Sequence, residues 1–202
     1  MSVDISTTWL GLKLTHPVFP GASPLVDDLD MVKALEDAGA SAITMHSLFE
    51  EQLVAEQMAA HRHLDGFSGL NAEAQSWFPS TADFVLGPDQ YLEQLQKIRK
   101  TVAVPVIASL NGMTPGGWIE YAKLIEQAGA HAIELNLYAL PSSSAIDGET
   151  LEREQLSIIS SVKSMVSIPV GIKLSAFHSS LPHFAKRIEA MGAAGLILFN
   201  QL

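Results

Sequence analysis

The sequence predicts an α/β fold, an incomplete (β/α)8 barrel of the TIM type with about six of its eight βα units. Two kinds of apolar segment alternate strictly along the chain. Such alternation with intervening helices is typical of a parallel sheet. One kind begins with Pro-Val, at 17–22, 105–110 and 169–174, and the other follows a helix-ending glycine, at 42–45, 132–136 and 195–200.

The length supports a barrel over an open sheet. Three strand–helix doublets fill the 202 residues, and a fourth would bring the chain near the roughly 250 residues typical of a complete barrel. No G-x-G-x-x-G motif follows the first strand, so a dinucleotide-binding sheet is disfavoured. We expect a single domain over 1–202, C-terminally incomplete, with an insertion at about 48–87. The sequence leaves open whether the chain is truncated or is completed by a partner chain.

Local patterns justify the individual elements. Continuous apolar runs suit strands covered on both faces, and a proline at the first strand position loses no interior ladder bond. Apolar residues spaced three to four apart predict helices over 88–100, from Thr114-Pro115 to 128, and over 151–165. Glycines stand where helix C-termini need a left-handed residue, at Gly39, Gly129 and Gly192.

Composition excludes several function classes. Twelve Lys and Arg against 22 Asp and Glu leave a net charge of −10, which argues against nucleic acid and anionic membranes as partners. The absence of cysteine excludes disulfides, thiolate metal sites and a cysteine nucleophile. We expect no metal site. With no signal peptide and no apolar run of about 18 residues, a cytoplasmic protein is expected.

Polar residues cluster where the predicted strands end, which in such barrels is the active-site face. Lys173 is the most informative, because an ammonium between Ile172 and Leu174 in a buried strand needs an anion or an electron-rich ring. Pairing with Glu134 on a neighbouring strand is the simpler alternative. Turn formation is an alternative role for Asn136 and Asn200. The strand-end residues are Ala22, Ser23, His46, Ser47, Ser109, Asn111, Asn136, Tyr138, Lys173, Ser175 and Asn200.

Several of these segments carry a family resemblance. The stretch 11–18 reads GLKLTHPV and leads into Gly-Ala-Ser at 21–23; ELNL follows at 134–137, PVGIKL at 169–174 and an asparagine at 200. Together they resemble the class 1 branch of the dihydroorotate dehydrogenase family. The resemblance implies an FMN-containing barrel that oxidises dihydroorotate to orotate in pyrimidine biosynthesis. It further implies FMN contacts from Ala22, Ser23, Ser47, Asn136 and Lys173, and substrate contacts from Asn136 and Asn200.

The departures from the family pattern indicate a divergent branch. Ala139 stands where the family has the cysteine or serine that removes a substrate proton, so the catalytic base is unknown and Tyr138 and Ser142 are candidates. His46 replaces a lysine of the family before Ser47, and could donate to a flavin oxygen or pack as a structural histidine. Glycine-rich phosphate loops after a seventh and eighth strand are not found in this sequence.

Three functions remain open at this point. The first is an FMN-dependent dehydrogenase that acts on CH–CH groups of a small molecule, either dihydroorotate or an altered substrate, in a homodimer. The second is a degenerate, non-catalytic barrel that acts as an interaction or assembly subunit. The third is an aldolase- or synthase-type barrel in which Lys173 forms a Schiff base. The electron acceptor is not identifiable from the sequence.

Overall fold

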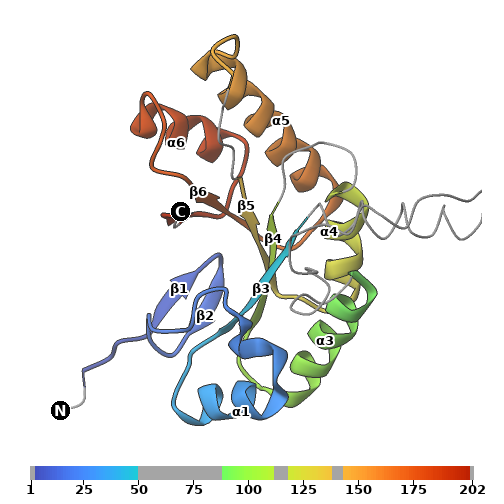
Figure 1. The fold of residues 1–202 in the computed structure, drawn as a ribbon. Helices are drawn as coiled ribbons and strands as arrows, with labels where there is room; N and C mark the ends of the chain where they lie inside the picture. Colours follow the sequence, from blue (N-terminus) through green and yellow to red (C-terminus); the bar gives the residue numbers. More distant parts are fainter. Residues whose placement is uncertain (1–2, 50–87, 112–117, 138–142, 201–202) are drawn as a thin grey trace, which may run out of the picture.

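The fold is a parallel α/β sheet with its strands in chain order (Figure 1). The computed structural model describes residues 3–49, 88–111, 118–137 and 143–200. Every neighbouring pair in the sheet is parallel, which is the strand order of a (β/α) barrel and agrees with the predicted fold class. The strands are β3 (Ile43–Phe49), β4 (Val106–Asn111), β5 (Ala132–Asn136), β6 (Val170–Leu174) and β7 (Gly195–Leu198).

Helices cover one face of this sheet, and a small hairpin lies against the other (Figure 1). The hairpin pairs β1 (Thr7–Trp9) with β2 (Leu12–Leu14), antiparallel. The helices predicted at 88–100 and 151–165 are confirmed, while the Thr114-Pro115 start lies outside the described residues. No helix in the described part of the chain is long and apolar enough to cross a membrane. The helices are α1 (Leu29–Asp37), α3 (Pro88–Thr101), α4 (Trp118–Gln127), α5 (Gly148–Met165) and α6 (Leu181–Ala190).

The helix ends match the sequence signals. Gly39, Gly129 and Gly192 have φ values of 97°, 96° and 82°, the left-handed conformation predicted for them. The carboxylates of Asp28 and Asp147 accept backbone N–H groups at the starts of α1 and α5. These caps satisfy donors that the first helical turn leaves free.

One predicted strand does not form. Residues 17–22 are irregular, so the described parallel sheet has five strands where about six units were expected. Pro17 and Pro20 have no N–H to donate, and the Val18 N–H donates to His16 Nδ1. The Val18 carbonyl accepts hydrogen bonds from the backbone N–H and the hydroxyl of Ser41, which lies two residues before β3. β3 itself runs through Phe49, and the rest of the predicted insertion at 48–87 lies outside the described residues.

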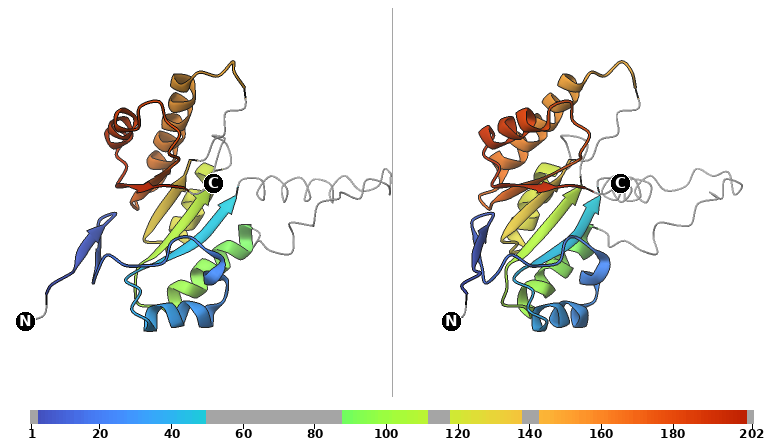
Figure 2. Two further views of the ribbon diagram at one scale, coloured as in Figure 1. Left: turned by 60° about the vertical axis from the view of Figure 1, so that its left-hand side comes forward. Right: turned by 90° about the vertical axis from the view of Figure 1, so that its left-hand side faces the viewer.

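The hairpin closes the end of the sheet at which the strands begin (Figure 2). Leu10 and Leu14 are buried against Ala42, Ile107 and Ala132, at or beside the first residues of three strands. Glycines give Leu10 its room, because a Cβ at position 171 would lie 2.8 Å, and one at 195 2.9 Å, from Leu10 Cδ2. The carboxyl ends of the strands are therefore the end of this face that the hairpin leaves open.

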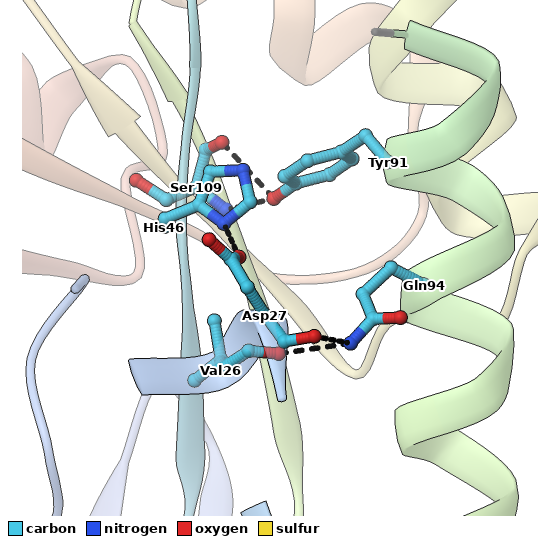
Figure 3. A network of polar contacts seen from close by, with 6 residues as sticks. All are labelled: Val26, Asp27, His46, Tyr91, Gln94 and Ser109. Carbon is cyan, nitrogen blue, oxygen red and sulfur yellow. Dashed lines mark hydrogen bonds and ion pairs between the residues drawn. The ribbon is translucent and has the colours of Figure 1, made fainter. Parts of the chain in front are cut away.

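A β-bulge interrupts the pairing of β3 with β4. Thr44 pairs with Ile107 and Ser47 with Ser109, so two residues of β3 face one of β4. The Tyr91 hydroxyl of α3 fills the resulting gap: it accepts the Ser109 N–H at 2.9 Å and donates to the Ser109 carbonyl at 3.2 Å (Figure 3). Burial raises the pKa of Tyr91, so the phenol keeps the proton that it donates.

Replacing Tyr91 with phenylalanine tests this bridge. We expect Tyr91→Phe to lower the free energy of unfolding by about 2–4 kcal/mol, because it leaves two buried backbone groups without a partner. Urea unfolding followed by circular dichroism measures the change. Thr101→Ala is the matched control, since it removes an exposed helix hydroxyl of α3, and its effect should stay below about 0.5 kcal/mol. Equal effects of the two changes would contradict the bridging role.

His131 makes stability depend on pH. Its Nδ1 accepts the Val106 N–H at 2.9 Å, and burial together with the Arg99 charge lowers the pKa of His131 from its usual 6.5. The unfolded chain therefore binds protons first as the pH falls below about 6.5, and the free energy of unfolding falls with it.

We expect His131→Asn to reduce the stability lost between about pH 7 and pH 5, because asparagine can accept the Val106 N–H without titrating. Denaturant unfolding at several pH values measures the slope. Above about pH 7.5 both proteins should show the same slope, since histidine is neutral in both states there. An unchanged slope in the acid range would refute the assignment.

Candidate functional site

Two rows of polar residues lie on the sheet face that carries the hairpin. The register places Ser47, Ser109 and Glu134 side by side. Two residues further along the strands, Asn111, Asn136 and Lys173 are side by side as well. Residues two apart on a strand share a face, so both rows continue the face on which Ile107 and Ala132 meet the hairpin. The polar rows thus lie at the carboxyl end of the sheet, as the sequence predicted for an active site.

Lys173 is paired across the strands. Its Nζ donates to Glu134 Oε1 at 3.1 Å, and the side chains are 17% and 10% exposed. The simpler alternative for Lys173, pairing with Glu134, is therefore present in the structure. A buried ammonium that is paired with a carboxylate is tolerable at this depth, whereas an isolated ammonium would not be. Among the described residues, Nζ donates one hydrogen bond, to Glu134. Because an ammonium has three N–H groups, donors remain for a ligand.

Asn136 stands beside Lys173 with an unmet hydrogen-bonding need. The residue is 5% exposed, and its Oδ1 atom has no hydrogen-bond partner in the described part of the chain. A buried acceptor left unpaired costs about 1–3 kcal/mol, so the position favours a bound group that supplies an N–H or O–H. The interior of the rows therefore presents one cation and one free amide oxygen next to each other.

Two serines complete the row that contains Glu134, which we call the lower row; the row of Asn111, Asn136 and Lys173 is the upper row. The Oγ atoms of Ser47 and Ser109 lie 2.8 Å apart, and either can be the donor. Because each hydroxyl has one donor and two acceptor positions, the pair retains capacity for a further hydrogen bond.

The remaining predicted residues flank these rows. Ser23 directly precedes the short helix η1 (Pro24–Asp27), and its Oγ is buried without a partner among the described residues. Asn200 follows β7, and its backbone N–H donates to the carbonyl of Leu174, next to Lys173. Tyr138, Ala139 and Ser142 lie outside the described residues, and the prediction that Tyr138 or Ser142 is the base is therefore untested.

His46 does not join the rows. The bulge turns its ring toward η1 and α3, where Nδ1 lies 2.7 Å from Asp27 Oδ1, at ion-pair distance but without the angle of a hydrogen bond (Figure 3). The ring also meets Tyr91 edge-on, with centroids 5.4 Å apart. Of the two interpretations of His46, packing against protein groups is the one that these contacts support.

Two further residues of this region escaped the sequence analysis. Tyr91 reads as part of the apolar stripe of its helix, and nothing in that pattern reveals that its hydroxyl bridges a strand. Gln94 donates from Nε2 to the carbonyls of Val26 and Asp27, at 2.9 and 3.1 Å (Figure 3). Its polar side chain lies three residues after Tyr91, on the apolar side of the helix, and this break in the apolar pattern is a signal in the sequence for a buried polar contact.

Known structures share the fold. The chain aligns with a protein assigned as a phosphonomutase from Burkholderia cenocepacia J2315, at a TM-score of 0.50 and 17% identity, over 84% of this chain and 64% of that one. It aligns with PhdJ bound to a substrate intermediate at a TM-score of 0.51 and 12% identity, over 90% and 46%. These neighbours are TIM-barrel enzymes, and at such identities they show the fold alone.

Curated sequences give a closer relation, although no protein-family model matches the chain. A protein assigned as dihydroorotate dehydrogenase A (fumarate) of Aeropyrum pernix is 37% identical over 115 residues, 54% of this chain and 36% of its own length. The catalytic subunit of dihydroorotate dehydrogenase B (NAD(+)) of Geobacillus sp. WCH70 is 36% identical over 102 residues, 49% and 32% of the two chains. The corresponding subunit of Endomicrobium trichonymphae is 27% identical over 208 residues, 99% and 62%.

The chain thus spans from about a third to about three fifths of the length of these relatives. The two types, A and B, are matched alike, and the resemblance predicted from the strand-end motifs is confirmed. By sequence, this chain is similar to the dihydroorotate dehydrogenases, and by fold it is similar to TIM-barrel enzymes.

Proposed function

We propose that this chain binds FMN at the carboxyl end of its sheet and is an oxidoreductase of the dihydroorotate dehydrogenase type. Its substrate is dihydroorotate or a similar small cyclic amide, which places the protein in pyrimidine biosynthesis in the first case. Bound FMN would accept the hydride that the substrate gives up. The similarity to the dihydroorotate dehydrogenases supports this proposal. The observation that carries it is Oδ1 of buried Asn136, beside Lys173, which has no partner among the described residues.

The donor set suits a flat heterocycle with its own N–H and C=O groups. Asn136 Oδ1 can accept an N–H, the remaining donors of Lys173 can reach carbonyl or ring nitrogen atoms, and a cation there stabilises negative charge on a reduced ring. Ala22, Ser23 and Ser47 would line the cofactor. Asn200, at the end of β7, would join Asn136 on the substrate. The protein would thus supply orientation and charge, and the cofactor the redox step.

Proton removal is the step for which this chain departs from its relatives. The substrate must lose a proton as well as a hydride, and Ala139 cannot accept one. Tyr138 and Ser142 are proposed as the groups that take its place. A substrate whose proton is more acidic than that of dihydroorotate would also relieve the need for a strong base.

A second candidate function, a non-catalytic assembly subunit, is favoured by a different observation. In the described part of the chain β7 pairs only with β6, and Leu198 and Phe199 at its end are 57% and 42% exposed. An unpaired strand edge next to exposed apolar side chains is a surface that proteins usually cover. The expected homodimer remains a prediction under either function.

Titration of the purified chain with FMN tests the first function. We expect binding, seen as a change in flavin fluorescence and a rise in melting temperature. The double variant Lys173→Met/Glu134→Gln should weaken FMN binding about tenfold or more, because it removes a charge-assisted donor without stranding a buried charge. Asn136→Leu should weaken it similarly, because it removes the buried amide oxygen that has no partner in the described part of the chain.

Lys123→Met is the matched control, because Lys123 is an exposed lysine of α4, a helix on the face of the sheet opposite the polar rows (Figure 1). Its affinity for FMN should equal that of the unmodified chain. Failure of the unmodified chain to bind FMN would overturn the proposed function. If that failure came with self-association that Leu198→Lys abolishes in sedimentation measurements, the assembly role would be favoured instead.

A further inference from the structure

The segment that carries Ala22 and Ser23 lacks the support that a strand would give it. Residues 17–22 form no ladder, so strand pairing does not hold this segment in place. Its upstream anchor is the contact of the Val18 carbonyl with Ser41, together with the His16 Nε2 contact to the Gly39 carbonyl at 2.6 Å. The position of Ser23 therefore also depends on a second anchor, downstream of it.

That downstream anchor is η1. Val26 is fully buried in the main core, and Gln94 of α3 donates to the carbonyls of both Val26 and Asp27. The Asp27 carboxylate lies 2.7 Å from His46 Nδ1 (Figure 3). An apolar contact, a pair of hydrogen bonds and the close contact of Asp27 with His46 thus attach one short turn to two different elements, α3 and β3.

The bulge in β3 is what makes His46 available for this contact. Because of the bulge, Ser47 and not His46 pairs with Ser109 in the lower polar row, and the His46 side chain is directed away from that row. Tyr91 bridges the gap in the ladder and packs against the His46 ring, so the ring is held from a second side. With its side chain 12% exposed, His46 is well placed to hold Asp27 and poorly placed to contact a ligand in the rows.

We propose that His46 is a positioning residue, which through Asp27 holds the Ala22–Ser23 segment at the carboxyl end of the sheet for the cofactor. This inference rests on the proposed function, because it assigns to that segment a part in FMN binding. The role differs from the direct flavin contact that the sequence position suggested. Asp27, His46 and Gln94 together form what we call the η1 clamp.

Two measurements on the full chain test the clamp, one of which needs no ligand. Amide hydrogen exchange over residues 22–28 reports how firmly η1 is held, and an FMN titration reports binding. His46→Leu and Asp27→Asn should each raise exchange in this segment and weaken FMN binding, both about tenfold. The double variant should be no worse than either single one, because both changes break the same contact.

His46→Asn is the conservative variant, since its side-chain amide nitrogen can take the position of Nδ1 beside the Asp27 carboxylate. It should restore both readouts to near their original values. Glu93→Gln is the matched control, because it breaks an exposed ion pair on α3 with Lys97 and should change neither readout.

The outcomes separate the clamp from the proposed function. Unchanged exchange over 22–28 in His46→Leu, or additive effects of the two single changes, would overturn the clamp. Weak FMN binding by His46→Asn, with exchange as in the unmodified chain, would mean that His46 contacts the cofactor directly and would also overturn it. If exchange responds as expected but the unmodified chain binds no FMN, the proposed function fails, and with it the part of the clamp in cofactor binding.

Discussion

The register of the parallel strands is the constraint on which the site depends. Because neighbouring strands run in the same direction and are in register, residues far apart in the chain share a row: Ser109 with Glu134, and Asn136 with Lys173. A shift of one residue in any strand would move its polar residues to the helix-covered face. Apolar side chains on that other face, such as Leu110, Leu135 and Ile172, hold the register, since each is fully buried under the helices.

Within this frame, charge is kept balanced and hydrogen bonding is left incomplete. Lys173 and Glu134 neutralise each other's charge, which makes a cation tolerable on a largely buried face. Asn136 Oδ1 and Ser23 Oγ have no hydrogen-bond partner among the described residues, and both atoms are buried. Buried polar groups that lack partners are uncommon in folded proteins, and a bound ligand or an ordered water is one way in which they are completed. The two ends of the molecule thus differ: the hairpin fills one with apolar side chains, and the other retains unmet polar groups.

The bulge in β3 shows how a local irregularity can serve a larger arrangement. The bulge removes one position of hydrogen bonding between β3 and β4. The Tyr91 hydroxyl replaces it with two hydrogen bonds to the Ser109 backbone. In return the bulge directs two consecutive residues to different tasks, Ser47 to the polar row and His46 to η1. Without the bulge, strict alternation along the strand would not bring Ser47 into line with Ser109.

The sequence by itself determined the α/β class, the glycine-ended helices and the strand ends that carry Asn136 and Lys173, because these follow from short-range periodicity and from the rule that parallel strands point one way. Tertiary structure alone decided the rest. Residues 17–22 have the composition of a strand, but pairing depends on a neighbour, and the prolines leave few donors for one. His46 follows the strand pattern that suggested a ligand contact, but a bulge is a property of two paired strands and is not visible in either. The roles of Tyr91, Gln94 and Asp27 arise from contacts between different elements, 18 residues apart in sequence for Tyr91 with Ser109 and 68 for Gln94 with Val26. No periodic pattern within one element encodes such a contact.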